Sequence, residues 1–150
     1  MASDPVPPSE TPPPPPPPAA TGPSPVSVWL QSSGLPGKLL AFGGLAGLLM
    51  IIIMLMRFGG ALDWRGLLLL FAFIGCVAAG WFLYQPKAEA QRKTWLYVAL
   101  GSAGIAGLFA LWLFINFVRI VLPFEILVVF LAGIAVVVGA VLEARAQKLF

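Results

Sequence analysis

Four apolar stretches, each of 18 residues or more, constrain this chain more than any other feature. They cover residues 39–56, 66–84, 94–118 and 123–142. About 20 helical residues, rising 1.5 Å each, are needed to cross roughly 30 Å of hydrocarbon. None of the stretches alternates polar and apolar residues as a membrane-spanning strand would. We therefore predict an all-α integral membrane protein in which residues 37–150 form a four-transmembrane-helix bundle.

The composition agrees with lipid as the solvent of most of the chain. Of the 150 residues, 59% are hydrophobic and only 10% are charged, whereas soluble domains are about 25% charged. The net charge of +3 comes from basic residues scattered near the ends of the predicted spans. Nucleic-acid binding needs a basic patch, and the sequence has none. We predict the lipid bilayer as a partner and no nucleic acid.

The first 36 residues form a proline-rich segment that we predict to be a disordered N-terminal tail. They contain 13 of the 15 prolines, including the run Pro12–Pro18, and too few apolar residues for a core. Seven consecutive prolines favour a polyproline II rod of about 22 Å. Two interpretations stay open, a solvated linker and a recognition segment for a polyproline-binding partner. Within the tail, residues 26–35 are predicted to lie along the membrane interface, with Trp29 at headgroup level.

The distribution of basic residues predicts the orientation in the membrane. Four spans place six of them on the side of the termini and three on the opposite side. The six are Lys38, Lys87, Arg92, Lys93, Arg145 and Lys148, and the three are Arg57, Arg65 and Arg119. Cytoplasmic loops carry the excess of lysine and arginine. We therefore expect a bacterial inner membrane with both termini in the cytoplasm.

Small residues at helical spacing predict where the spans pack, because they let helices approach closely in lipid. The predicted packing residues are Gly43, Gly47, Ala72, Cys76, Gly80, Ala103, Gly107, Ala135 and Gly139. The third span has small residues around much of its circumference, so we expect it to be the centre of packing. Docking of a partner helix on such residues is the alternative to packing within the chain.

Aromatic residues close to the predicted span ends are typical of an interfacial belt. They are Trp29, Trp64, Trp81, Tyr84, Trp95 and Tyr97. Trp112 lies further inside the third span, and we expect it to pack in the core.

The residues that most enzymes and metal proteins need are scarce. The chain has no histidine, and Cys76 is its single cysteine, so no intramolecular disulfide or Cys/His zinc site can form. No phosphate-binding loop or nucleophile motif is present. We predict that the chain is not an enzyme and holds no cofactor or metal, and that bound lipid is the one ligand left open.

Ionisable residues inside a membrane are functional candidates by default. None lies at mid-span in this sequence. The nearest are Arg119 and Glu125, which together with the polar Asn116 flank the short connection between the third and fourth spans. We predict that they form a polar cluster in which Arg119 neutralises Glu125 and Asn116 bonds to either. The cluster is either a proton or cation site or a clamp for the hairpin. We expect residues 143–150 to extend the last helix into water, because they include good helix formers.

These features favour a non-catalytic accessory or scaffold subunit that packs against other transmembrane subunits of a larger complex. That complex would be a respiratory, photosynthetic or secretion assembly. Bundles without polar interiors have little equipment for turnover. One alternative is a small oligomeric transporter or pore with the polar cluster at its mouth. Another is a membrane tether that presents the polyproline segment.

Overall fold

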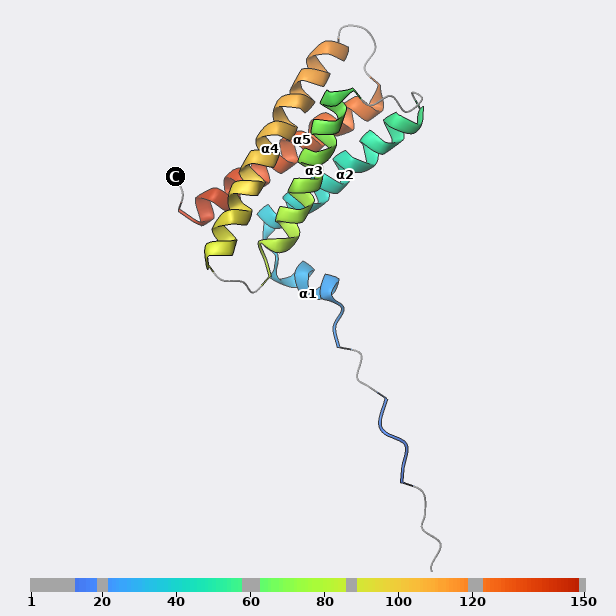
Figure 1. Cartoon of the computed structure of the whole chain (residues 1–150), viewed down its shortest axis with the longest axis vertical. Helices are drawn as coiled ribbons and strands as arrows, with labels where there is room; N and C mark the ends of the chain where they lie inside the picture. The colour runs from blue at the N-terminus through green and yellow to red at the C-terminus, as the bar shows by residue number, and fades with distance from the viewer. Residues whose placement is uncertain (1–12, 19–21, 58–62, 86–88, 119–122, 149–150) are drawn as a thin grey trace, which may run out of the picture.

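The computed structural model describes residues 13–18, 22–57, 63–85, 89–118 and 123–148. Every regular element within these ranges is a helix (Figure 1). The helices are α1 (Pro25–Ser32), α2 (Leu35–Arg57), α3 (Trp64–Phe82), α4 (Glu89–Phe117) and α5 (Phe124–Ala146). The last four are each long and apolar enough to cross a membrane. This confirms the prediction of an all-helical protein with four helices of transmembrane length.

The long helices extend past the predicted apolar spans. Helix α2 begins at Leu35, because Pro36 fits the first helical turn, where no backbone N–H is needed. Helix α4 begins at Glu89, and its 29 residues give about 44 Å of helix. That length exceeds the hydrocarbon thickness, so the polar first turns of α4 extend beyond it.

Part of the predicted tail is helical. Residues 13–18 of the proline run are exposed and form no regular element, while residues 1–12 and 19–21 lie outside the described residues. Helix α1 then begins at Pro25, and the Ser24 side chain caps it by accepting a hydrogen bond from the backbone N–H of Ser27. Proline in the first turn after a serine cap is a strong helix start.

Helices α2 to α5 form a closed ring in which each packs against the next along the chain and α5 also packs against α2 (Figure 1). Consecutive helices run in opposite directions. One end of the bundle therefore carries the starts of α2 and α4 and the ends of α3 and α5, and we call it the tail end. The opposite end, where α2 and α4 finish, is the far end.

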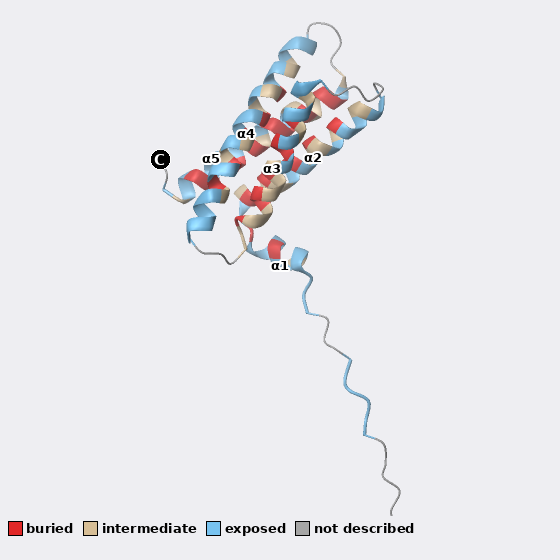
Figure 2. Cartoon of the chain, in the orientation of Figure 1, coloured by how far each residue is buried: buried red, intermediate tan, exposed pale blue. Residues whose placement is uncertain are grey.

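Helix α5, and not α4, is the centre of packing. In the most apolar 18-residue stretch of α5, 44% of the residues are buried, against 22% in the corresponding stretch of α4. Buried positions line the inner sides of the helices (Figure 2). The prediction for the third span was wrong because some of its small residues face outward. A Cβ added at Gly101 or Gly104 would meet no atom within 4 Å.

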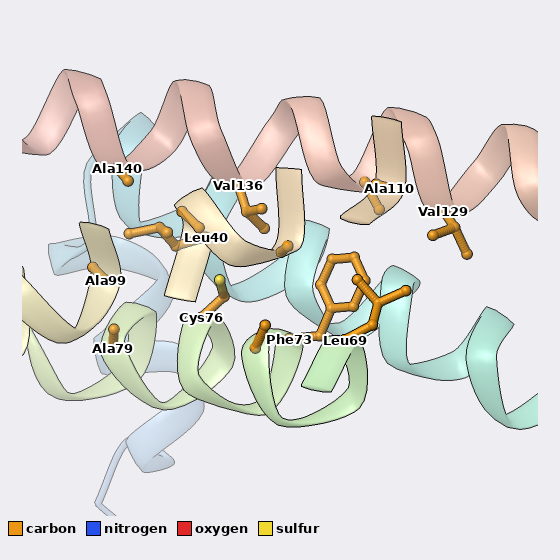
Figure 3. Close-up of a cluster of buried hydrophobic side chains, with 14 of the residues drawn as sticks. Leu40, Leu69, Phe73, Cys76, Ala79, Ala99, Ala110, Val129, Val136 and Ala140 are labelled. Atoms are coloured by element: carbon orange, nitrogen blue, oxygen red, sulfur yellow. The ribbon is translucent and has the colours of Figure 1, made fainter. Parts of the chain in front are cut away.

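The core consists of small residues and a few large side chains (Figure 3). Leu40, Phe73 and Val136, from three different helices, are fully buried. The Phe73 ring lies so close to Gly47 that a Cβ there would come within 2.5 Å of ring carbons. Seven of the nine predicted packing residues are buried, and Gly107 and Ala135 are partly buried. In lipid, such close approach is what holds helices together.

Candidate functional site

The tail end of the bundle contains a buried carboxylate, Glu143. The sequence predicts that this residue lies in water. Glu143 lies near the end of α5, on the buried face that carries Val136, Gly139 and Ala140. Steps of three and four residues keep these side chains on one face of a helix. Only 4% of Glu143 is exposed. The helix extends past the apolar span to Ala146 as expected, but Glu143 does not lie in water, because the buried face of α5 continues one turn further than the apolar sequence.

Two neutral donors satisfy this carboxylate. The Tyr84 hydroxyl donates to one oxygen of Glu143 over 2.7 Å, and the Gln147 side-chain amide donates to the other over 2.8 Å. Within the described part of the chain, Glu143 forms no ion pair. Burying an acid is costly unless it is paired or hydrogen-bonded, so Glu143 depends on these two bonds.

Tyr84 follows the end of α3 and is covered by the start of α2. Gly37 lies against its ring, and a Cβ at position 37 would overlap the ring carbons. Burial, and next the hydrogen bond to Glu143, raise the pKa of the Tyr84 hydroxyl above its usual range. The hydroxyl therefore stays protonated and remains a donor. This one side chain joins the ends of α3 and α5, and α2 can cover it only because residue 37 is a glycine.

Helix α1 is attached to the same end through Trp29, which is 7% exposed. Its ring stacks on Trp81 with 5.6 Å between centroids and meets Phe42 edge-on at 6.0 Å. Its indole N–H donates to the backbone carbonyl of Gly80 over 3.1 Å. Aromatic pairs with a satisfied indole N–H are a favourable way to fix a tryptophan. Trp29 thus holds α1, the helical part of the tail, against the bundle.

At the far end, Glu125 has a partner that the sequence did not predict. It lies in the first turn of α5, and Arg57 in the last turn of α2 donates a hydrogen bond to it within an ion pair. Asn116 is exposed and donates to the carbonyl of Trp112 on its own helix over 2.7 Å. Arg119 lies outside the described residues. The predicted Arg119–Glu125 pair therefore stays a prediction, and the described residues show a clamp between α2 and α5, because the ring places the end of α2 beside the start of α5.

Tryptophans at the far end surround a second arginine. The guanidinium carbon of Arg65 lies 4.7 Å from the ring centroid of Trp112 and 5.3 Å from that of Trp64. Trp112 is 41% exposed. The prediction that it packs in the core was wrong, because it lies on the outer side of α4, where a cation can stack on its face.

The remaining aromatics of the predicted belt lie at the tail end. Trp95 stacks on Phe82 with 4.6 Å between ring centroids, Trp81 contacts Trp29, and Tyr97 is 62% exposed. Aromatic side chains near span ends suit the headgroup region.

Between its two ends the described interior is apolar. Glu125 and Glu143 are 18 residues apart on α5, which is five full turns, so they share one face at a separation of about 27 Å. The buried residues between them on α5 are Ile126, Val129, Ala132, Gly133, Val136, Gly139 and Ala140. Cys76 is buried in the same core. In the ranges that the structure describes, no group of three or more His, Cys, Asp or Glu residues could hold a metal ion.

Sequence reasoning did not single out Gly37, Arg57, Glu143 or Gln147 as residues of these sites. Glu143 had a usable signal, since it continues the buried face of α5 at the spacing of Gly139 and Ala140. Arg57 had none, because its pairing depends on which helices are neighbours in the ring. No known family model matches the chain, and no curated protein or solved structure is significantly similar to it.

Proposed function

We propose that the chain is a non-catalytic accessory or scaffold subunit that packs against a larger membrane complex. The observation that carries this proposal is the apolar interior between Glu125 and Glu143. The buried residues of α5 between these two acids are all aliphatic or glycine. Ion and proton pathways need ionisable side chains or water at membrane depth. Here both buried acids stand at the ends of the bundle, where each is already held by a partner.

A groove between α2 and α5 is the surface that best suits a partner helix. It has a volume of about 400 Å³. Its floor includes Gly43, Ala46 and Ala135, and Phe42 and Leu131 border it with 53% and 55% of their surface exposed. Small residues between larger ones allow a second helix to approach closely in lipid.

The first test is extraction of the tagged native protein in mild detergent, followed by native-gel sizing and mass spectrometry of co-migrating chains. We expect a stoichiometric larger partner. Migration as a monomer or small homo-oligomer, together with liposome flux that Glu125→Gln abolishes, would favour a transporter or pore and contradict the proposal.

A matched pair of variants tests the groove itself. Leu131→Trp fills the groove, whereas Leu67→Trp enlarges an exposed leucine of α3. We expect at least a tenfold loss of the co-purified partner for the first and none for the second. Gly43→Leu and Gly107→Leu would not separate loss of partner binding from damage to the bundle itself. Atoms added at these positions meet Val136 or Val137 within the bundle.

A second candidate function, a membrane tether, is favoured by the docking of Trp29. This contact fixes the helix that follows the proline run, so the run would leave the bundle from a defined point. Deletion of residues 1–22 keeps α1 and its serine cap. Loss of a recruited protein with an unchanged bundle would support tethering, and unchanged recruitment would make the run a spacer.

We also propose a bacterial inner membrane with the tail end in the cytoplasm. Of the described basic residues, Lys38, Arg92, Lys93, Arg145 and Lys148 lie at the tail end and Arg57 and Arg65 at the far end. The excess marks the cytoplasmic side. Cysteines introduced at Gln31 and Val118, both exposed, report the two sides to an impermeant thiol reagent, while the buried Cys76 gives little background. Labelling of Gln31→Cys in intact cells would overturn this orientation.

A further inference from the structure

We propose that the seam between α4 and α5 binds one anionic phospholipid of the surrounding bilayer. Its phosphate would lie at the tail end, and one acyl chain would follow the seam into the membrane. Two separate hollows on the same pair of helices support this, one polar and one apolar.

The apolar hollow is a groove of about 490 Å³ that begins at Gly104, near the middle of α4. Gly104 and Gly107 of α4 and Gly133 of α5 form part of its lining, with Leu111 and Val137 beside them. Gly107 and Gly133 are packed, because a Cβ at either would come within 2.7 Å of Val137 or Ala110, so Gly104 is the glycine that leaves open space. A Cβ at Gly104 would meet nothing within 4 Å, so this part of the seam is open to lipid.

The polar hollow lies at the tail end of the seam and has a volume of about 380 Å³. Arg92 and Lys93 from the first turns of α4 line it, together with Glu89, Ala146 and Gln147. Lys93 is 3.9 Å from Glu89, but both side chains are well exposed, and such surface pairs are weak. Arg92 forms no ion pair with any residue that the structure describes. A guanidinium beside an ammonium is the donor set that a phosphate prefers.

The two hollows lie along a common path. Lys93 and Gly104 are eleven residues apart, which places them within about 20° of one another around α4 and about 16 Å apart along it. On α5 the exposed side of the groove continues from Ile134 through Val138 to Arg145, which does not line the polar hollow but precedes Ala146, which does. A lipid spans about 20 Å from headgroup to midplane. A phosphate near Lys93 therefore puts the end of an acyl chain at Gly104.

The order of chemistry along the seam identifies the occupant. From the tail end inward, basic side chains at headgroup depth are followed by an apolar hollow at hydrocarbon depth. A phospholipid has its phosphate and its acyl chains in the same order. A partner helix would fit the apolar hollow but would leave Arg92, which forms no ion pair with any described residue, without a counter-charge. Charge complementarity therefore favours the lipid.

The acyl half of the proposal is tested on the full chain in nanodiscs of phosphatidylethanolamine and phosphatidylglycerol, followed by native mass spectrometry of the released protein. We expect one retained phosphatidylglycerol on the wild type. Gly104→Phe fills the groove, and Gly101→Phe is its control, because position 101 is equally open but lies outside the groove. The first should lower retention at least tenfold and the second should leave it unchanged. Equal retention by both variants overturns the proposal.

The headgroup half is tested with two charge-matched double variants. Arg92→Gln with Lys93→Gln removes the cations of the polar hollow, and Lys38→Gln with Arg65→Gln removes two charges elsewhere. We expect about 30-fold weaker phosphatidylglycerol binding for the first, since each basic residue near a membrane surface contributes about a factor of five. An equal loss in both doubles, or a wild type that retains no phospholipid, overturns the proposal. Neither result bears on the accessory function, because the isolated chain is measured.

Discussion

The two ends of the bundle hold the same residue type in opposite settings. Glu125 and Glu143 share one face of α5, yet Glu125 meets the charged Arg57, while Glu143 is satisfied by the neutral Tyr84 and Gln147. The helix dipole adds to the contrast, since an acid is favoured in a first turn, as at Glu125, and disfavoured in a last turn, as at Glu143. At the far end the charge of Glu125 is thus compensated by Arg57. At the tail end Glu143 depends on the packing that holds Tyr84 and Gln147 within hydrogen-bonding distance.

This difference locates the sensitive part of the molecule. The tail end joins α1, α2, α3 and α5 through Trp29, Gly37, Tyr84 and Glu143. The far-end clamp is a single pair in which the arginine is 67% exposed. Substitutions of similar size should therefore cost more at the tail end than at the far end.

The largest effect is expected from Gly37→Ala, because the new Cβ would overlap the Tyr84 ring. Overpacking of this kind costs about 3 kcal/mol. The control is Gly34→Ala, where the nearest atom would be 3.4 Å away and little change is expected. The free energy of unfolding in mixed micelles measures both. Equal stability of the two variants would show that α2 does not need to lie so close to Tyr84.

Tyr84→Phe should have the next largest effect, since it removes one of the two donors to Glu143 and leaves the ring in place. A buried acceptor left short of a partner costs about 2 kcal/mol. Tyr97→Phe, at a tyrosine that is 62% exposed, is the control and should be nearly neutral. Restoration of stability in Tyr84→Phe by adding Glu143→Leu would confirm that the loss came from the carboxylate.

Ser33→Ala should act in the opposite direction. Ser33, between α1 and α2, is buried, and its hydroxyl has no hydrogen-bond partner among the described residues. Removing an unsatisfied hydroxyl should raise the unfolding free energy by about 1 kcal/mol. A loss of stability of that size would instead show that the hydroxyl has a partner, such as an ordered water.

Length and hydropathy made the four long helices predictable, because a transmembrane helix is specified locally by its own residues. The partners of Glu125 and Trp29 were not predictable, since they depend on which helices become neighbours. Glu143 lies between these cases. Its 18-residue distance from Glu125 places both acids on one face, so the periodicity of α5 could have indicated burial once that face was known to be the inner one.

The smallest loss is expected from Glu125→Gln. It removes the charge from the far-end pair but keeps a side chain that can still accept a hydrogen bond from Arg57. Because Arg57 is largely exposed, water and salt already weaken the attraction, and the loss should be smaller than that of Tyr84→Phe. Raising the ionic strength should lower the stability of the wild type slightly and leave the variant unchanged. A loss as large as that of Tyr84→Phe, without salt dependence, would mean that the far end is as buried and as demanding as the tail end, and the contrast between the two acids would fail.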